Sequence, residues 1–422
     1  MRKTIGLLLF FAACTDGGGR GDDNGGGGTQ NPPAATGQGE TVFTAGSDAS
    51  NPFFASLGTN LRTCASCHDE TAGWSLTPAL LQTRFNAGDG TDPVFRSVDG
   101  TTSPTADTST AAARQTSYAL LLQRGLIRVG KGIPEGAEFT LASVSDPYGF
   151  ATAAELSLFR RPLPSTNLGF LSQIMWDTRE ATLATQATDA TTGHAQAMGV
   201  DTTQIDQIVA FESSIYTAQR SDDVAGDLAE GGGGAQALST QALLPGSRNA
   251  FTLYGAWANV DTSTAEGQRR ASIARGERIF NTEPINIQGV AGLPDQRGSC
   301  STCHDRPNVG DHATAVPMNI GVADANQRTD NLPGLPRYTF RNTTTGATVT
   351  ITDPGLALVT GKWADIGRFK IPVLRGVAMR PPYFHNGFAN DLRAVVQFYR
   401  QRFNMRLSDQ EETDLVNFLS AL

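Results

Sequence analysis

Cysteine and histidine residues form two copies of one short pattern, Cys64-Ala-Ser-Cys67-His68 and Cys300-Ser-Thr-Cys303-His304. This C-x-x-C-H spacing is that of c-type haem attachment, in which two thiols bond to the haem vinyl groups and the adjacent histidine ligates the iron. The alternatives are a zinc site and redox-active dithiols. Zinc ribbons separate their cysteine pairs by about 15 to 20 residues, whereas these pairs lie in opposite parts of the chain, and dithiols give no reason for a histidine after each pair. The sequence therefore predicts two covalently bound c-type haems, with His68 and His304 as iron ligands.

The composition limits the class of protein and of partner. The chain has 422 residues, with 33 Lys and Arg against 41 Asp and Glu and a formal net charge of -8. This length is enough for two domains, and an acidic chain without a basic run argues against nucleic acid as a partner. The five cysteines are too few for a disulfide-built scaffold, and the attachment motifs use all of them except Cys14.

The first residues have the features of an export signal. A basic start is followed by an apolar run over residues 5–11 and by Ala-Ala-Cys14, which is typical of a secretory signal and of a lipoprotein cleavage site. We expect residues 1–39 to be a signal peptide and a glycine-rich tether, and the protein to be periplasmic or at the cell surface. It would be held to a membrane only through a lipid anchor at Cys14. Ordinary signal cleavage, with Cys14 incidental, is the alternative.

Helices are the elements that the pattern predicts to position the two haems. A break in composition over residues 222–246 suggests a linker between two cytochrome c-like haem domains, residues 40–230 and 240–422. We therefore expect a mainly α fold in which an internal repeat relates the two domains, with a short strand near residues 347–351. The apolar residues expected to share a helical face are Ile205, Ile208, Val209, Ile215 and Tyr216 before the break, and Leu392, Val395, Val396, Tyr399 and Phe403 after it. Ser408 and Glu411 form a possible capping box for a further helix.

A second repeat lies downstream of each haem motif. Trp176 follows Pro164, and Phe384 follows Pro372, at the same spacing of 12 residues. In the helices expected next, Ala190 of the first half corresponds to Tyr399 of the second. If the two helices lie over their haems in the same way, one haem faces a methyl group and the other a phenol, so the two sites are expected to differ chemically.

The chain resembles the bacterial dihaem cytochrome c peroxidase family, including its MauG-type members, from about Thr41 to Leu422. Besides the attachment motifs, the resemblance rests on Leu158-Phe-Arg-Arg-Pro-Leu-Pro, Met175-Trp176-Asp177, Phe369-Lys-Ile-Pro-Val-Leu-Arg-Gly and Pro382-Tyr-Phe-His-Asn-Gly. It implies that the N-terminal haem is peroxidatic, that the C-terminal haem transfers electrons, and that Trp176 relays charge between them. Hydrogen peroxide and a small electron-donor cytochrome or cupredoxin are the partners it implies.

The sixth ligand of the second haem iron distinguishes the common peroxidases of this family from its MauG-type members. The common peroxidases have a methionine there and MauG-type members a tyrosine, and in this chain the position is Tyr399. A phenolate favours ferric iron, whereas a thioether favours ferrous iron and a high potential. The alternative is that Tyr399 only packs on an apolar helical face, and that a different side chain is the ligand. The candidates are Met379, Met405, His312 and His385.

In the common peroxidases that the chain resembles, a histidine soon after the first attachment motif closes the resting haem, and activation removes it. No histidine occurs between His68 and His194, so the resemblance implies a first haem that is open or water-bound and needs no reductive activation. Peroxide cleavage also needs a distal base. By resemblance, Gln186 matches the family's glutamine, but Gln196 stands where the family has glutamate, and an amide accepts no proton at neutral pH. His194 has the right pKa range to replace it, although a lone histidine is more often structural.

The most favoured function is an exported dihaem peroxidase, with Trp176, Gln186, His194 and Gln196 as its catalytic candidates. A MauG-like oxidase of a protein or organic substrate is the alternative that Tyr399 favours, and a plain dihaem electron-transfer protein is a third. The family's calcium site uses an asparagine at the position of Arg161, so calcium is possible without support from the sequence.

Overall fold

The computed structural model describes residues 37–46, 48–325 and 334–422. The chain divides into Met1–Ala34 and one compact unit, Ala35–Leu422. The predicted export signal, Cys14 and almost all of the tether lie outside the described residues. Within those residues, no helix is both long enough and apolar enough to pass through a membrane.

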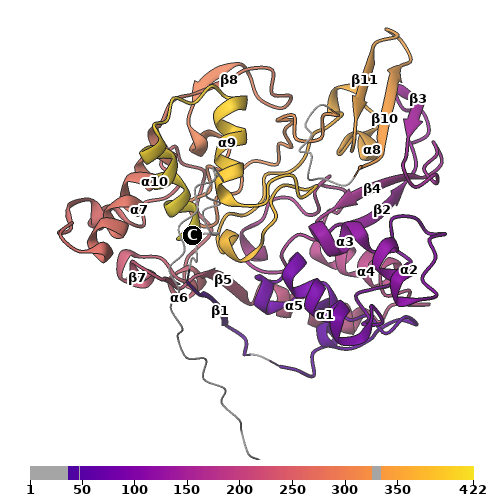
Figure 1. Cartoon of the computed structure of the whole chain (residues 1–422), viewed down its shortest axis with the longest axis horizontal. Helices are drawn as coiled ribbons and strands as arrows, with labels where there is room; N and C mark the ends of the chain where they lie inside the picture. The colour runs from indigo at the N-terminus through magenta and orange to yellow at the C-terminus, as the bar shows by residue number, and fades with distance from the viewer. Residues whose placement is uncertain (1–36, 47, 326–333) are drawn as a thin grey trace, which may run out of the picture. The chain divides into compact units, whose positions relative to one another are not determined.

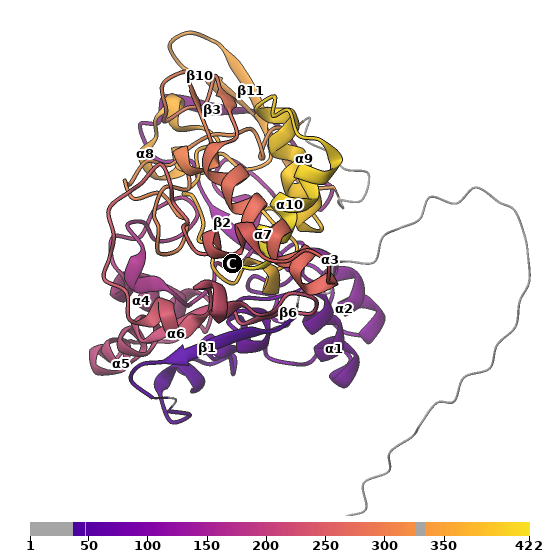
Figure 2. The same cartoon turned by 90° about the vertical axis from the view of Figure 1, so that its left-hand side faces the viewer.

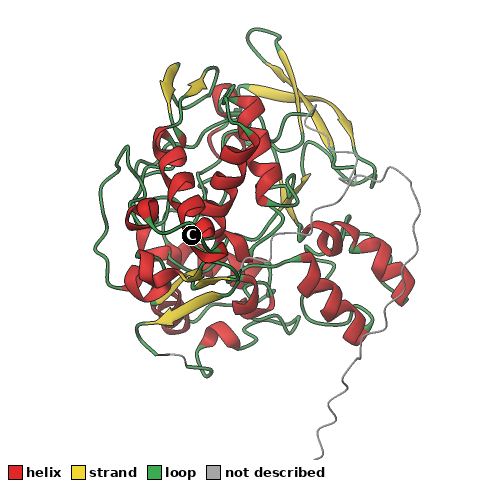
Figure 3. Ribbon diagram, turned by 60° about the vertical axis from the view of Figure 1, so that its left-hand side comes forward, coloured by secondary structure: helices red, strands yellow, loops and turns green. Residues whose placement is uncertain are grey.

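The described chain contains both helices and short strands, which follow one another in groups (Figures 1 and 3). The helices are α1 (Pro78–Gly88), α2 (Ala111–Ser117), α3 (Ala119–Arg124), α4 (Leu183–Gly193), α5 (Thr202–Ser213), α6 (Ala235–Ser239), α7 (Ala265–Thr282), α8 (Ala357–Thr360), α9 (Leu392–Arg402) and α10 (Asp409–Ser420). The strands are β1 (Gly39–Phe43), β2 (Ile127–Lys131), β3 (Phe139–Ser145), β4 (Leu156–Arg160), β5 (Ile215–Gln219), β6 (Ser221–Asp222), β7 (Gly226–Asp227), β8 (Ile285–Ile287), β9 (Gln296–Gly298), β10 (Arg337–Asn342) and β11 (Thr348–Ile351).

The expectation of a mainly α fold is confirmed only in part, because antiparallel strands join distant parts of the chain. β1 pairs with β5, β2 with β4, and β10 lies between β3 and β11. Figures 1 and 2 both show β3 beside β10 and β11. The strand expected near residues 347–351 is confirmed as β11. The division at residues 230 and 240 and the internal repeat stay predictions.

The prediction that Ile215 and Tyr216 continue the helical face of Ile205 and Ile208 is wrong. Ile205 and Ile208 are buried on α5, but the helix ends at Ser213, and Ile215 begins β5. β-branched and aromatic residues favour a strand, and the pairing of Ile215 with Phe43 of β1 decides the outcome. The capping box is confirmed: the Ser408 hydroxyl accepts from the Glu411 amide, and the Glu411 carboxylate accepts from the Ser408 amide.

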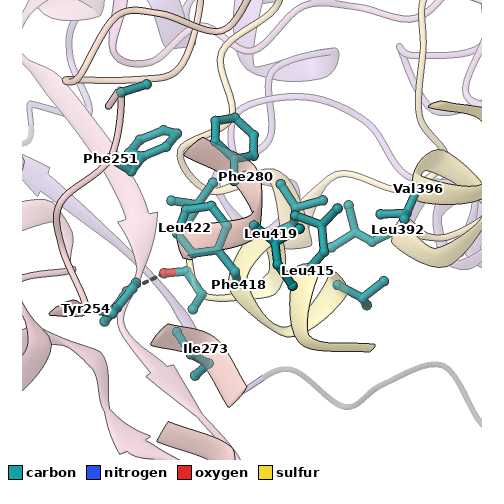
Figure 4. Close-up of a cluster of buried hydrophobic side chains, with 14 of the residues drawn as sticks. Phe251, Tyr254, Ile273, Phe280, Leu392, Val396, Leu415, Phe418, Leu419 and Leu422 are labelled. Carbon is teal, nitrogen blue, oxygen red and sulfur yellow. Dashed lines mark hydrogen bonds between the residues drawn. The ribbon is translucent and has the colours of Figure 1, made fainter. Parts of the chain in front are cut away.

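The core of the C-terminal half is built from α7, α9 and α10 (Figure 4). Phe280 of α7 and Phe418 of α10 are buried with ring centroids 5.5 Å apart, and burial of each such side chain contributes about 1.5–3 kcal/mol. The Tyr254 hydroxyl donates to the Ala421 carbonyl at 2.6 Å and holds the chain end against this core. Cys300 and Cys303 of the second haem motif pack against this core, which therefore supports the motif.

Candidate functional site

Each haem motif is wound into one tight turn. Cys64 and Cys300 begin the 3-10 helices η2 (Cys64–Ser66) and η7 (Cys300–Thr302). In both, the carbonyl of the first cysteine accepts hydrogen bonds from the amides of the second cysteine and of the histidine, at 3.0–3.2 Å. Thr63 and Ser66 cap the first turn reciprocally, and Ser299 and Thr302 cap the second. None of these four cysteines forms a disulfide in the described structure. For the thiol form, burial raises the pKa of Cys300 and of Cys303 to about 12.

The histidines of both motifs are oriented in the same way. Nδ1 of His68 lies 3.1 Å from the Trp74 carbonyl, and Nδ1 of His304 lies 2.5 Å from the Gly310 carbonyl. Because a carbonyl only accepts, Nδ1 must carry the proton, and the lone pair is left on Nε2. Burial lowers the pKa of each imidazole to about 4, so both rings are neutral at pH 7. A buried neutral imidazole with a backbone partner on Nδ1 is the usual form of a metal-ligating histidine.

Two cavities adjoin these motifs, one lined by His68 and the other by His304. Thiols, a neutral imidazole and mainly apolar walls make up each lining. These residues fit a c-type haem in each cavity, held by Cys64, Cys67 and His68 in the first and by Cys300, Cys303 and His304 in the second.

The structure brings Tyr399 into the second cavity together with His304. The ring of Tyr399 stacks on Phe403 at 5.8 Å, and burial raises the pKa of its phenol above the usual range. Of the alternative ligands, Met405 and His385 also line this cavity, whereas Met379 and His312 are not among its lining residues. The identity of the sixth ligand stays a prediction, with Tyr399 retained.

Trp176 lines both cavities. Its indole nitrogen donates to the Arg161 carbonyl at 2.8 Å, and its own carbonyl accepts from the Lys370 amide at 2.9 Å. The indole lies edge-on to His385 at 6.1 Å, and His385 in turn stacks on Phe369 at 4.0 Å. A rigidly held π system therefore separates the two cavities.

Arg161 also lines both cavities and is buried. Its guanidinium donates to the carbonyls of Leu76, Arg124 and Arg380 at 2.5, 2.8 and 3.4 Å. Burial lowers its pKa to about 9. A positive charge therefore already occupies this carbonyl-lined position, and calcium binding stays a prediction. In the described part of the chain, no three His, Cys, Asp or Glu residues gather as a metal site would require.

One face of α4 and the residue after it form a wall of the first cavity. The side chains on this face are Leu183, Gln186, Ala187, Ala190, Thr191 and His194. Gln196, two residues beyond His194, is exposed and is not among the lining residues. Of the predicted acid–base candidates, the structure therefore brings Gln186 and His194 together beside His68 and leaves Gln196 outside.

Sequence reasoning missed three charged residues of the first cavity, Arg62, Asp99 and Glu212. Nδ1 of His194 lies 2.6 Å from Oδ2 of Asp99, and Nη1 of Arg62 donates to the same oxygen at 2.6 Å. Burial raises the pKa of Glu212 to about 7, and its Oε2 is buried without a hydrogen-bond partner. No local motif marks these residues. The only signal was a glutamate at 212 on the apolar face of a predicted helix.

Parts of the chain are similar to known proteins. No family model matches the chain. The cytochrome-c peroxidase IdrP2 of Denitromonas iodatirespirans is 34% identical over 142 residues, which are 30% of this chain and 36% of that protein. The methylamine utilization protein MauG of Paracoccus denitrificans is 49% identical over 43 residues, 10% of this chain and 11% of that one. The match thus spans about a third of the first relative's length. A solved MauG-like protein associated with microbial copper homeostasis is 16% identical with a TM-score of 0.43, covering 88% of this chain and 86% of that one.

Proposed function

We propose that this chain, which is similar over part of its length to cytochrome-c peroxidases and to MauG, is a dihaem peroxidase of that family. It would reduce hydrogen peroxide at the His68 haem with electrons that enter through the His304 haem. The observation that carries the proposal is a pair of cavities, each with an attachment turn, on the two sides of one tryptophan. A peroxidase needs a reaction site and an electron entry site in close contact, and Trp176 lies between the two.

Each hydrogen peroxide takes up two electrons and two protons and yields two molecules of water. The electrons come from a reduced small cytochrome or cupredoxin. When bound, the haems supply the redox chemistry that breaks the O–O bond. In the first cavity His194 accepts a proton from one peroxide oxygen and returns it to the other, while the Gln186 amide can hydrogen-bond to the substrate but cannot take a proton.

Tyr399 supports a second candidate, a MauG-like oxidase that draws its electrons from a protein or organic substrate. A phenolate ligand would favour ferric and higher oxidation states of the second haem. Uptake of electrons from a small cytochrome would then be less favourable, which leaves a protein or organic substrate as the electron source. A plain electron-transfer protein is the third candidate. It requires both irons to be six-coordinate, whereas Ala190 offers no ligand at the position of the first cavity that the sequence repeat matches to Tyr399.

The cellular place of the protein is part of the proposal. The apolar run before Cys14 and the glycine-rich stretch after it support export and a lipid anchor. A protein held in this way would meet peroxide and small donor proteins in the periplasm or at the cell surface.

The test is to mix the resting holoprotein with hydrogen peroxide and follow its absorption spectrum, with and without a reduced small cytochrome. A peroxidase gives a rapid spectral change that the donor reverses with two electrons consumed per peroxide. A rapid change that the cytochrome does not reverse favours the oxidase. No change, together with a low-spin first haem, contradicts both and supports the electron-transfer protein. Trp176→Phe should slow donor consumption while the first spectral change persists.

A further inference from the structure

The His194 ring is hydrogen-bonded to a buried ion pair formed by Asp99 and Arg62. Both residues line the first cavity and lie far from His194 in the sequence. The Asp99 side chain is 4% exposed and that of Arg62 is 2% exposed, whereas that of His194 is 37% exposed. Asp99 Oδ2 is 2.6 Å from His194 Nδ1, and Arg62 Nη1 lies 2.5 and 2.6 Å from the two carboxylate oxygens. The histidine is therefore the outer member of a row of three charged or ionisable groups.

The pairing determines which ring nitrogen of His194 carries the proton. A carboxylate only accepts hydrogen bonds, so Nδ1 of His194 must donate to Asp99. Burial alone would raise the pKa of Asp99, but Arg62 and His194 outweigh it and hold that pKa below its usual value, so the carboxyl is ionised. Within the described residues Nε2 has no hydrogen-bond partner, and His194 lines the cavity beside His68. The nitrogen left with a free lone pair is the one available to a ligand in that cavity.

Besides its ion pair with Asp99, Arg62 is held by two backbone carbonyls. Its Nε donates to the Pro93 carbonyl at 3.0 Å and its Nη2 to the Val94 carbonyl at 2.7 Å. The amide nitrogen of Asn60 donates to the His194 carbonyl at 2.7 Å. Both the backbone and the ring of His194 are thus tied to the segment that leads into the first haem motif, and little freedom remains for the ring to turn.

We propose that Asp99, held by Arg62, is a positioning residue that keeps His194 in the tautomer whose Nε2 can take a proton from a ligand entering the first haem cavity. This inference rests on the proposed function in taking peroxide as that ligand. One proton leaves the first peroxide oxygen, is carried on Nε2, and is returned to the second oxygen, which departs as water. The two electrons that the O–O bond takes up come from the bound haem and are replaced by the electron donor.

The Asp99→Asn substitution separates this role from a merely structural one. The amide is nearly isosteric, but Arg62 requires an acceptor and will hold the amide oxygen. The amide nitrogen then faces His194 and donates to Nδ1, so the ring shifts its proton to Nε2 and loses the free lone pair there. A carboxylate that orients an imidazole has this effect on tautomer in hydrolase triads as well.

The experiment measures two rates in the holoprotein by stopped-flow absorption, the reaction with peroxide and the association of cyanide. Hydrogen cyanide must lose a proton to bind iron as an anion, so its association reports the base without any turnover. We expect Asp99→Asn and His194→Gln each to slow both rates by about 10²–10⁴-fold. The double variant should be no slower than either single one, because both changes remove the same function.

Asp414→Asn is the matched control. Asp414 is also buried and paired with an arginine, Arg275, at 2.7 Å, but it lines neither cavity. This variant should lower the melting temperature and leave the cyanide rate within about twofold. If Asp99→Asn does not fold, Asp99→Glu keeps the anion for Arg62 while displacing the carboxylate from Nδ1, and it should slow both rates in the same direction.

A folded Asp99→Asn that binds cyanide at the wild-type rate overturns the proposal, as does a multiplicative loss in the double variant. Wild-type rates in His194→Gln overturn it as well, since Asp99 would then have no base to position. A wild-type protein that binds cyanide quickly but does not react with peroxide contradicts the proposed function alone, because the cyanide rates still test Asp99.

Discussion

Glu212 lines the first cavity, and within the described residues its buried Oε2 has no hydrogen-bond partner. It lies on α5, and burial raises its pKa from 4.5 to about 7. A carboxyl group that is partly protonated at neutral pH can both donate and accept a proton. Such a group beside a proposed peroxide site could hold a second proton, which the His194 side chain by itself does not supply.

The raised pKa of Glu212 predicts a pH-dependent stability. Below about pH 4.5 the carboxyl is protonated in both the folded and the unfolded chain and contributes no difference. Between about pH 4.5 and 7 the carboxyl ionises in the unfolded chain, where water solvates the charge, before it ionises in the folded chain. This difference lowers the free energy of unfolding by about 3 kcal/mol once the pH is above 7. Glu212→Gln should therefore be more stable than wild type at pH 8 and equal to it at pH 4. Denaturant unfolding at both values measures this, with exposed Glu135→Gln as the control; equal stability at pH 8 would show that Glu212 is not desolvated.

Tyr399 is predicted to set the potential of the second haem. Tyr399→Met should raise that potential by a few hundred mV, within the range of about 0.8 V that axial ligands span, because a thioether favours ferrous iron. A spectroelectrochemical titration measures the shift. Tyr383→Phe is the control, since Tyr383 lines the same cavity and is not predicted to ligate. An unchanged potential and spectrum in Tyr399→Met would return the assignment to Met405 or His385.

At the scale of elements, the strands that join the two halves of the sequence carry a buried polar contact. The Tyr338 hydroxyl of β10 donates to the Ser157 carbonyl of β4 at 2.7 Å and accepts from the Ser157 amide at 2.9 Å. Tyr338 is fully buried. One phenol thus satisfies both backbone groups of a residue from the other half of the chain.

Tyr338→Phe leaves a buried amide and a buried carbonyl without partners. We expect a loss of about 1–3 kcal/mol in the free energy of unfolding for each unsatisfied group, with both haem spectra unchanged because Tyr338 lines neither cavity. Thermal or urea unfolding measures the loss. Tyr148→Phe provides the comparison, since Tyr148 is only partly buried and its hydroxyl makes no hydrogen bond within the described chain. Equal melting temperatures for the two variants would contradict the importance of the contact.

Elements with local signals could be predicted from the sequence, and those that depend on distant partners could not. The capping box at Ser408 and the strand near residue 350 follow from neighbouring residues. Ile215 was assigned to a helix because its strand character depends on pairing with Phe43, far away in the sequence. The dyad of Asp99 and His194 was missed for the same reason, since 95 residues separate the two.

At the scale of the whole molecule, Arg160 joins both halves of the sequence through carboxylates. It holds Asp353 with Nε and Nη2 at 2.6 and 2.9 Å, and Asp177 with Nη1 at 2.6 Å. All three side chains are buried. Burial alone would raise the pKa of Asp177, but Arg160 and Arg179 outweigh it and lower that pKa well below its usual value. The stability that Asp177 contributes is therefore present above the ordinary aspartate pKa of about 4 and is lost as the pH falls below it.

Asp353→Asn should destabilise the whole compact unit, because the Arg160 guanidinium loses one of its two anionic partners in a buried site. Breaking a buried ion pair costs about 3–5 kcal/mol, so we expect this loss in the free energy of unfolding. Asp227→Asn breaks an exposed pair with Arg220 and should cost no more than about 1 kcal/mol. Because Asp177 is next to Trp176 in the chain, the Asp353 variant should also slow electron transfer between the haems while leaving cyanide association unchanged. If stability falls but transfer between the haems keeps its wild-type rate, the ion pair supports the fold without fixing the tryptophan.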